Sequence, residues 1–213
     1  MIFQLFFPPK CALCRKVLSK EETDLCHHCR EHAPEFTHAK NNLPFVAKWT
    51  AVWYYKDNVR GSLLRYKFYD YRSYANLYGK LLAMKVLEDG LIYDCVSWVP
   101  VSKKRLRKRG FDQVELIARV AAEALGLPLE TTLHKLRDTP AQSSLRNIAQ
   151  RKANVLGAYK SIAPETVSGK HILLLDDVIT TGATASECAR VLLTAGAKDV
   201  SCAAVAAASY HKK

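Results

Sequence analysis

A segment near the C-terminus carries the clearest structural signal: Ile172-Leu173-Leu174-Leu175-Asp176-Asp177-Val178-Ile179-Thr180-Thr181-Gly182-Ala183-Thr184. Its apolar first part is typical of a strand buried on both faces, as in a parallel sheet. Two carboxylates follow at the point where α/β sheets bind ligands, the carboxyl ends of their strands. A turn of small hydroxyl residues with one glycine then leads into a predicted helix, whose first backbone N–H groups are free to bind a phosphate.

These features together predict a ligand with two kinds of group. Carboxylates accept hydrogen bonds from hydroxyls, and an N–H-rich turn suits a phosphate, so a sugar phosphate fits both. No Gly-Lys-Ser/Thr follows the turn, and the segment is therefore not a nucleotide-binding P-loop. The alternative interpretation is a capped helix after an acid-rich turn.

Strands and helices alternate on both sides of this segment. Strands are predicted over Trp49–Tyr55, Tyr93–Val99, Leu129–Leu136, Lys170–Leu175 and Asp199–Ala206, with an extended stretch over Gly157–Ile162. Helices are predicted over Asp57–Phe68, Arg72–Glu88, Asp112–Leu125 and Ala185–Thr194, with a short one through Ala153. This alternation predicts βαβ units and an α/β fold with a parallel-sheet core.

Four of the seven cysteines form two pairs, Cys11-Ala12-Leu13-Cys14 and Cys26-His27-His28-Cys29. Two such turns aim four sulfurs at one point, which is typical of a tetrahedral, closed zinc site. We therefore predict structural Zn²⁺ on Cys11, Cys14, Cys26 and Cys29; unrelated free thiols or a redox pair are the alternatives. The predicted domains are a four-cysteine zinc-ribbon module over residues 1–45 and a second domain over residues 46–213.

The net charge of +12 indicates an anionic partner. Most of the excess lies in residues 51–110, and six of the seven residues Lys103–Arg109 are basic. No apolar run reaches the roughly 18 residues that cross a bilayer, and the start lacks the features of a signal peptide. An odd cysteine count with scattered single cysteines argues against disulfides. We expect a cytoplasmic protein without membrane insertion.

The segment over residues 172–184 resembles the motif that binds phosphoribosyl diphosphate (PRPP) in type I phosphoribosyltransferases. The resemblance implies a fold of that type, with Asp176 and Asp177 as catalytic residues that bind the ribose hydroxyls. It implies a 5′-phosphate site formed by Thr180, Thr181, Gly182, Ala183 and Thr184. It also implies that the basic loop binds pyrophosphate, where we predict contacts from Ser102, Lys103, Arg105 and Arg109. For any one cation of that loop, a solvated or nucleic-acid-facing side chain is the alternative.

The order of motifs along nearly the whole chain is similar to the ComF (GntX-like) competence-protein family. The run Arg109-Gly110-Phe111-Asp112-Gln113 narrows the resemblance, although many members carry Asn where Asp112 stands. The resemblance implies natural transformation, with single-stranded DNA and a competence helicase as partners in DNA uptake. It also implies Mg²⁺-dependent transfer of ribose 5-phosphate from PRPP to an unknown acceptor, releasing pyrophosphate. Independently of this resemblance, the polar loop over Arg137–Leu145 is predicted to be a lid, with a plain surface loop as the alternative.

The alternative function is a non-catalytic adaptor that handles single-stranded DNA on a former transferase fold. Basic and aromatic residues interleave in the most basic part of the chain, as they do in single-strand binders. The aromatic residues of that stripe are Tyr54, Tyr55, Tyr66, Phe68, Tyr69, Tyr71 and Tyr74. Core packing of much of this stripe is the other explanation.

Overall fold

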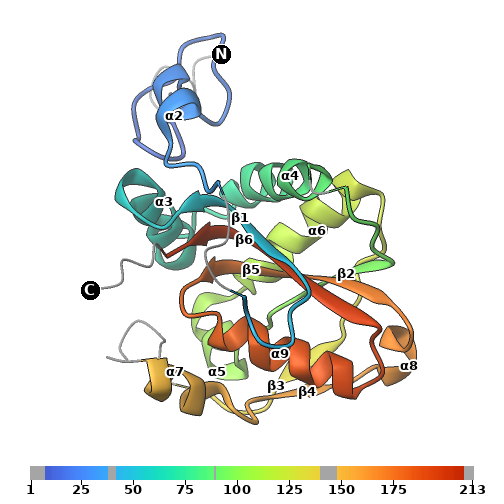
Figure 1. Cartoon of the computed structure of the whole chain (residues 1–213). Coiled ribbons are helices and arrows are strands. Elements are labelled where there is room, and N and C mark those ends of the chain that lie inside the picture. Colours follow the sequence, from blue (N-terminus) through green and yellow to red (C-terminus); the bar gives the residue numbers. More distant parts are fainter. Residues whose placement is uncertain (1–7, 38–41, 89, 140–147, 209–213) are drawn as a thin grey trace.

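The computed structural model describes residues 8–37, 42–88, 90–139 and 148–208. Its centre is a four-stranded parallel sheet with the strand order β1-β6-β5-β2 (Figure 1). The strands are β1 (Trp49–Tyr54), β2 (Cys95–Trp98), β5 (His171–Ile179) and β6 (Asp199–Ala207). β5 and β6 occupy the middle of the sheet and are buried along most of their length, which explains their apolar sequences. The predicted α/β fold with a parallel core is confirmed.

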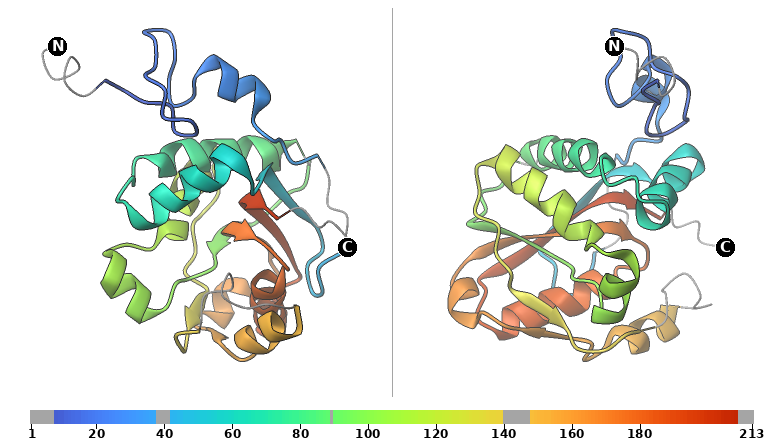
Figure 2. Two further views of the ribbon diagram at one scale, coloured as in Figure 1. Left: turned by 90° about the vertical axis from the view of Figure 1, so that its left-hand side faces the viewer. Right: turned by 180° about the vertical axis from the view of Figure 1, so that it is seen from behind.

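Helices cover both faces of this sheet (Figures 1 and 2). One side carries α3 (Asp57–Phe68), α4 (Tyr74–Leu87) and α6 (Gln113–Leu125). The other carries α7 (Ile148–Val155), α8 (Pro164–Val167) and α9 (Ala183–Thr194). The sequence predicted most of these helices to within two residues. Among the residues described, no helix combines the length and apolar character that a membrane crossing needs.

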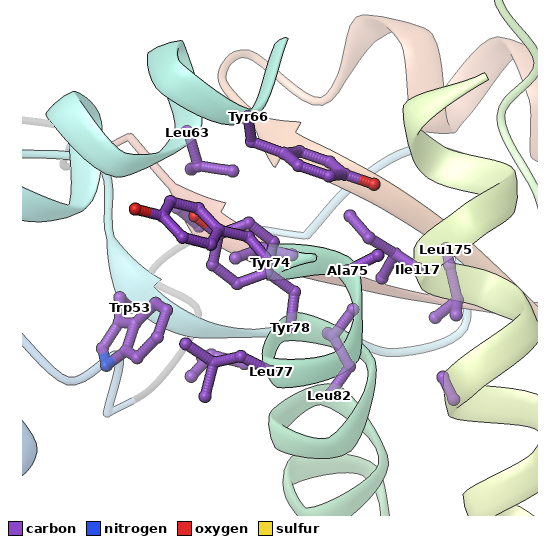
Figure 3. Close-up of a cluster of buried hydrophobic side chains, with 14 of the residues drawn as sticks. Trp53, Leu63, Tyr66, Tyr74, Ala75, Leu77, Tyr78, Leu82, Ile117 and Leu175 are labelled. Carbon is purple, nitrogen blue, oxygen red and sulfur yellow. The ribbon is translucent and has the colours of Figure 1, made fainter. Parts of the chain in front are cut away.

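The side of the sheet under α4 and α6 has an aromatic core (Figure 3). Tyr66 and Tyr78 are fully buried and meet edge to face, with ring centroids 5.4 Å apart. A Cβ on Gly79 would lie 2.5 Å from Val120 Cβ, so α4 approaches α6 closely only because this residue is glycine. This packing fixes α3, α4 and α6 as one layer above β5.

Three elements differ from the sequence-based expectation. The predicted strand over residues 129–136 is reduced to β3 (Leu133–Lys135), which pairs with β4 (Tyr159–Ser161) in a small antiparallel sheet. β5 continues beyond Leu175, so both acids lie inside the strand. The segment predicted as a basic loop is largely a helix, α5 (Lys103–Arg109), and that prediction was wrong. Local capping explains the helix, because Ser102 accepts a hydrogen bond from the Arg105 N–H.

The four-cysteine segment, which includes α2 (His27–His32), projects from the body beside α3 and α4 (Figure 2). Its residues Cys11, Ala12 and Leu13 are nevertheless buried in the same hydrophobic cluster as Leu63 of α3 and Tyr74 of α4. The core is therefore continuous from this segment into the α/β body. The domain boundary between residues 45 and 46 remains a prediction.

Candidate functional site

The first candidate site is formed by the four paired cysteines. The sulfurs of Cys11, Cys14, Cys26 and Cys29 all lie within 4.8 Å of one another, and the Sγ atoms of Cys14 and Cys26 are 3.6 Å apart. A tetrahedral zinc ion with Zn–S bonds of about 2.3 Å separates its sulfurs by about 3.8 Å. The donor type and the spacing therefore fit a structural zinc ion.

Backbone amides favour a thiolate at one of these sulfurs. Burial works to raise the pKa of Cys11, but hydrogen bonds from the backbone of Cys26, Cys14 and Leu13 outweigh it and lower that pKa to about 7. The thiolate is the form that binds metal. Burial raises the pKa values of Cys14 and Cys29, so four thiolates together need a cation to neutralise them.

The second candidate site is a cavity of about 740 Å³ at the carboxyl ends of β2 and β5. Its walls include Asp176, Asp177 and the whole turn over residues 180–184. The cations in its walls come from four different parts of the chain and are Lys67, Arg72, Arg105, Lys108, Arg109 and Lys135. The acids in the walls are Asp70, Asp176 and Asp177, so cations outnumber acids two to one. Such a cavity attracts an anion.

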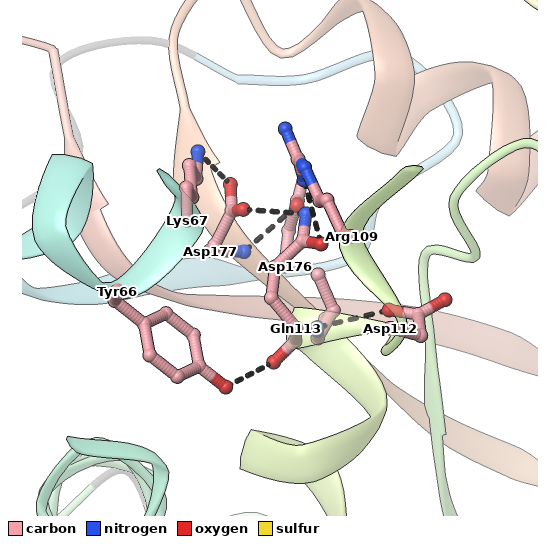
Figure 4. A network of polar contacts seen from close by, with 8 residues as sticks. Tyr66, Lys67, Arg109, Asp112, Gln113, Asp176 and Asp177 are labelled. Atoms are coloured by element: carbon pink, nitrogen blue, oxygen red, sulfur yellow. Dashed lines mark hydrogen bonds and ion pairs between the residues drawn. The ribbon is translucent and has the colours of Figure 1, made fainter. Parts of the chain in front are cut away.

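Asp177 is held on both of its oxygens by the helices above β5 (Figure 4). Lys67 Nζ on α3 lies 2.9 Å from Oδ1, and Gln113 Nε2 on α6 donates to Oδ2 at 3.2 Å. Gln113 Oε1 in turn accepts a hydrogen bond from Arg109 Nη1 at 2.7 Å. Because Asp177 is only 6% exposed, these partners fix the orientation of its carboxylate. Each oxygen keeps a lone pair for a ligand.

Asp176 has a different environment from its neighbour. Successive side chains of a strand point to opposite faces, and the charge of Asp176 acts on Tyr159 and Cys188 on the α9 side of the sheet. Burial, together with the charge of Asp177, raises the pKa of Asp176 to about 8, although Lys67 opposes the rise. Burial and the neighbouring negative charge therefore favour the protonated form of Asp176 in the ligand-free site.

The turn after β5 depends on a glycine for two reasons. Gly182 precedes α9 with a φ of +73°, which side chains rarely adopt, and a Cβ there would meet Leu43 Cδ2 at 2.2 Å. Leu43 is buried and comes from the segment between the cysteines and β1, so the N-terminal part of the chain packs on this turn. The 12-residue α9 then directs the positive end of its dipole toward the cavity.

The four residues predicted in the basic segment separate into two pairs. Arg105 and Arg109 line the cavity, whereas Ser102 and Lys103 do not. Ser102 is buried, caps α5 and donates a hydrogen bond to Asp138 Oδ1 at 2.5 Å. Lys103 is exposed to solvent. The helical backbone explains the separation, because α5 directs its side chains around an axis and only some of them face the cavity.

Asp112, the departure from the family pattern, is a helix cap that does not line the cavity. Its Oδ1 accepts hydrogen bonds from the N–H groups of Val114 and Glu115, and its Oδ2 accepts one from the Val101 N–H at 3.0 Å. The carboxylate therefore ties the start of α6 to the end of β2. Its negative charge is used within the backbone rather than at the cavity.

Known protein domains match the two segments of the chain that hold the candidate sites. A double zinc ribbon domain matches residues 2–40, and a phosphoribosyl transferase domain matches residues 114–213. The DNA utilization protein YhgH of Escherichia coli (strain K12) is 28% identical over 208 residues, which cover 89% of this chain and 86% of that protein. Competence protein ComFC of Streptococcus pneumoniae is 32% identical over 157 residues, or 70% and 64% of the two chains. The chain belongs to the ComF/YhgH competence-protein family.

The matches to some relatives are shorter. YhgH of Salmonella typhi is 36% identical over 108 residues, so the chain spans about half (46%) of that protein. Membership of the ComF/YhgH family confirms the predicted combination of a zinc ribbon with a phosphoribosyltransferase domain on an α/β fold. The zinc ribbon match covers the four cysteines, and the phosphoribosyl transferase match covers the acidic pair and the turn over residues 180–184.

Several polar residues of the cavity were not predicted from the sequence, and Lys67, Lys135 and Gln113 are the most informative of them. Lys67 and Lys135 come from α3 and β3, and Gln113 was quoted only as part of a motif. Lys135 is 7% exposed, and burial lowers its pKa. In the sequence it lies between His134 and Leu136, a context that does not distinguish it from an ordinary surface lysine. The predicted lid falls mostly on residues 140–147, which lie outside the described part of the chain.

Proposed function

We propose that this protein binds PRPP in the 740 Å³ cavity and transfers its ribose 5-phosphate to an acceptor, releasing pyrophosphate. One observation carries the proposal: the acidic pair and the turn over residues 180–184 line the same cavity, inside the segment that matches a phosphoribosyl transferase domain. The excess of cations in the walls supports a ligand with several phosphate groups. We propose that this activity takes place in the cytoplasm.

Each part of the ligand has a group of residues to receive it. The 5′-phosphate would bind at the start of α9, through Thr180, Thr181, Gly182, Ala183 and Thr184. The ribose hydroxyls would donate to Asp176 and Asp177. The diphosphate would lie against Arg105 and Arg109, with Lys135 as a further cation. When bound, Mg²⁺ neutralises charge on the diphosphate, mainly through ligand and water oxygens.

The reaction exchanges one bond at the anomeric carbon for another. The C1–O bond to the diphosphate breaks, and pyrophosphate leaves with the electron pair. An electron pair of the acceptor forms the new bond to C1, and the proton of the acceptor passes to water. Asp177, oriented by Lys67 and Gln113, presents negative charge near the ribosyl centre as positive charge develops there. Arg105 and Arg109 stabilise the leaving group.

An assay of pyrophosphate release tests this function. Isotope-labelled PRPP with Mg²⁺ would be offered single-stranded DNA, nucleobases and amines in turn. We expect release with one acceptor class, and loss of release in Asp177→Asn. The control is Asp70→Asn, an exposed acid of the cavity rim. Absence of release with every acceptor would count against transfer, while retained PRPP binding would leave the binding part intact.

The names of the relatives support a role in DNA handling, and we propose single-stranded DNA and a competence helicase as partners in natural transformation. An adaptor without catalysis is the second candidate, favoured by the exposed rings of Phe68 (61%) and Tyr69 (69%) beside the cavity cations. Tyr66 and Tyr74 of the same stripe are buried and belong to the core. If Asp177→Asn abolishes PRPP binding while DNA binding and transformation survive, the adaptor is correct. Strong salt dependence of DNA affinity is expected in both cases.

We also infer that the four thiolates hold one structural zinc ion, because their spacing fits a tetrahedral shell. Metal analysis of the purified chain tests this. We expect about one zinc per chain in the wild type and a large loss in Cys26→Ser. The control is Cys202→Ala, a buried cysteine of β6 outside the cluster, which keeps the zinc.

A further inference from the structure

The last turn of α3 contacts the first cysteine turn. Arg65 Nη2 donates to the carbonyl oxygens of Ala12 at 2.9 Å and of Leu13 at 2.7 Å, and these two residues separate Cys11 from Cys14. Ser62, one helical turn earlier, donates to the same Ala12 carbonyl at 2.6 Å. Arg65 Nε is buried without a hydrogen-bond partner among the described residues. The guanidinium group of Arg65 therefore binds the backbone between Cys11 and Cys14, the first two predicted metal ligands.

Of the next two residues of α3, Tyr66 contacts α6 and Lys67 lines the cavity. Tyr66 OH donates to the carbonyl oxygen of Gln113 at 2.7 Å, and Lys67 Nζ lies 2.9 Å from Asp177 Oδ1. Tyr66 is fully buried and the Lys67 side chain is 18% exposed, so both side chains have little conformational freedom. Three consecutive residues therefore connect the cysteine cluster, α6 and the acidic pair through one rigid turn of helix.

The position of the Ala12 and Leu13 carbonyls depends on the cysteine cluster. Four thiol groups within 4.8 Å are held together by a metal, and binding of that metal contributes to folding of the segment around it. Without the ion, the two carbonyls lose the support that aims them at Arg65. The last turn of α3 then loses one of the contacts that hold it in place. The backbone of Lys67, from which the side chain extends to Asp177, is then no longer fixed.

We propose that Arg65 is a positioning residue through which the four-cysteine cluster sets Lys67 against Asp177. The consequence for the ligand rests on the function proposed above. Metal in the cluster and PRPP in the cavity each strengthen binding of the other. Linkage makes this coupling reciprocal, so one factor describes both effects. The zinc ribbon is accordingly a structural part of the sugar site.

The first test needs no sugar ligand. Lysines are labelled briefly with an acetylating reagent in wild type and in Arg65→Met, both shown to contain zinc, and labelling is measured by mass spectrometry. We expect labelling of Lys67 to rise several-fold in Arg65→Met, with Arg65→Lys in between. Lys135, which lines the same cavity from β3, should stay as slow as in wild type. Unchanged Lys67, or an equal rise at Lys135 from general loosening, would overturn the proposal.

A matched control removes a different contact at the end of the ribbon. Lys85 on α4 lies 3.6 Å from Glu35, which follows the cysteine segment, and it does not touch α3 through that contact. Lys85→Met should leave Lys67 labelling at the wild-type rate. An increase equal to that in Arg65→Met would show that any weakening of the ribbon has the same effect, which would contradict a specific role for Arg65.

The second test measures the reciprocal effect on zinc. Release of zinc to a chelator is followed with and without PRPP and Mg²⁺. We expect PRPP to raise zinc affinity about fivefold or more, a factor typical of coupled sites, and Lys67→Met to abolish the effect. If wild type binds no PRPP, the proposed function fails, but Lys67 labelling still decides the role of Arg65. If PRPP binds and zinc retention does not change, the coupling is wrong while the function stands.

Discussion

Lys67 and Asp177 form an ion pair of 2.9 Å in the wall of the cavity, with side chains that are 18% and 9% exposed. Lys67 belongs to the helix after the first strand, and Asp177 to the central strand near the end of the chain. The pair joins the two ends of the α/β body at the point where a ligand would bind. The contributions of this ion pair to folding stability and to ligand binding can each be measured by substitution.

Asp177→Asn removes the charge that Lys67 faces. Leaving one partner of a largely buried pair uncompensated is costly, and we expect the free energy of unfolding to fall by about 1–3 kcal/mol. Urea unfolding measures this. The control is Asp70→Asn, because Asp70 and Arg72 form an exposed pair worth well under about 1 kcal/mol. Equal stability of Asp177→Asn and wild type would show that the ion pair contributes nothing.

Gly182→Ala combines backbone strain with a clash. Gly157 shares the positive φ, at +65°, but has open space around it, so Gly157→Ala should cost only the strain of about 1 kcal/mol. Gly182→Ala should cost clearly more, because its Cβ would overlap Leu43. Adding Leu43→Ala should cost less in this background than in wild type. Thermal unfolding of the four variants checks this, and equal costs for the two glycines would rule out the clash.

Asp112→Asn tests whether this residue is a cap or a ligand contact. An amide keeps one acceptor oxygen, so one of the backbone N–H groups that Asp112 satisfies loses its partner. We expect a loss of about 1–2 kcal/mol in unfolding free energy. PRPP affinity measured by calorimetry should stay within about twofold of wild type. A large loss of affinity without a loss of stability would place Asp112 in the binding site.

The sequence predicted the fold well where local chemistry determines it. Glycine caps such as Gly126, apolar strands such as Leu173–Leu175 and the paired cysteines are local signals, and the structure has elements at these places. The acidic pair and the glycine turn were located for the same reason. Their roles in binding remain predictions.

The rest of the site depends on contacts between distant segments. Lys67 looks like any lysine on the last turn of an amphipathic helix, and only tertiary packing brings it to Asp177. The helix over Lys103–Arg109 was missed for a different reason. Its caps, Ser102 and Gly110, are local signals, but a run of adjacent cations disfavours a helix in the absence of other contacts. The contact between Leu43 and Gly182 could not be predicted either, because the sequence before the first strand does not indicate where Leu43 packs.

The raised pKa of Asp176 predicts a pH dependence of stability. A carboxyl whose pKa is raised to about 8 in the folded state binds its proton more tightly there than in the unfolded chain. The free energy of unfolding of the ligand-free protein therefore falls as pH rises toward about 8. Asp176→Asn removes this contribution, so its stability relative to wild type should rise between about pH 6 and 8, by less than about 1.4 kcal/mol per pH unit.

Urea unfolding at several pH values in this range tests the sign. The comparison is the difference between variant and wild type, so the zinc site, common to both, cancels. A difference between Asp176→Asn and wild type that stays constant with pH would contradict the environment described for Asp176.

Calorimetric titration of the full chain with PRPP in the presence of Mg²⁺ tests the central claim most directly. Wild type and Asp70→Asn should give a saturable heat for one site per chain, and Asp177→Asn should reduce the affinity at least tenfold. No heat in wild type, or the same affinity in Asp177→Asn, would show that the acidic pair and its glycine turn do not bind a phosphorylated pentose.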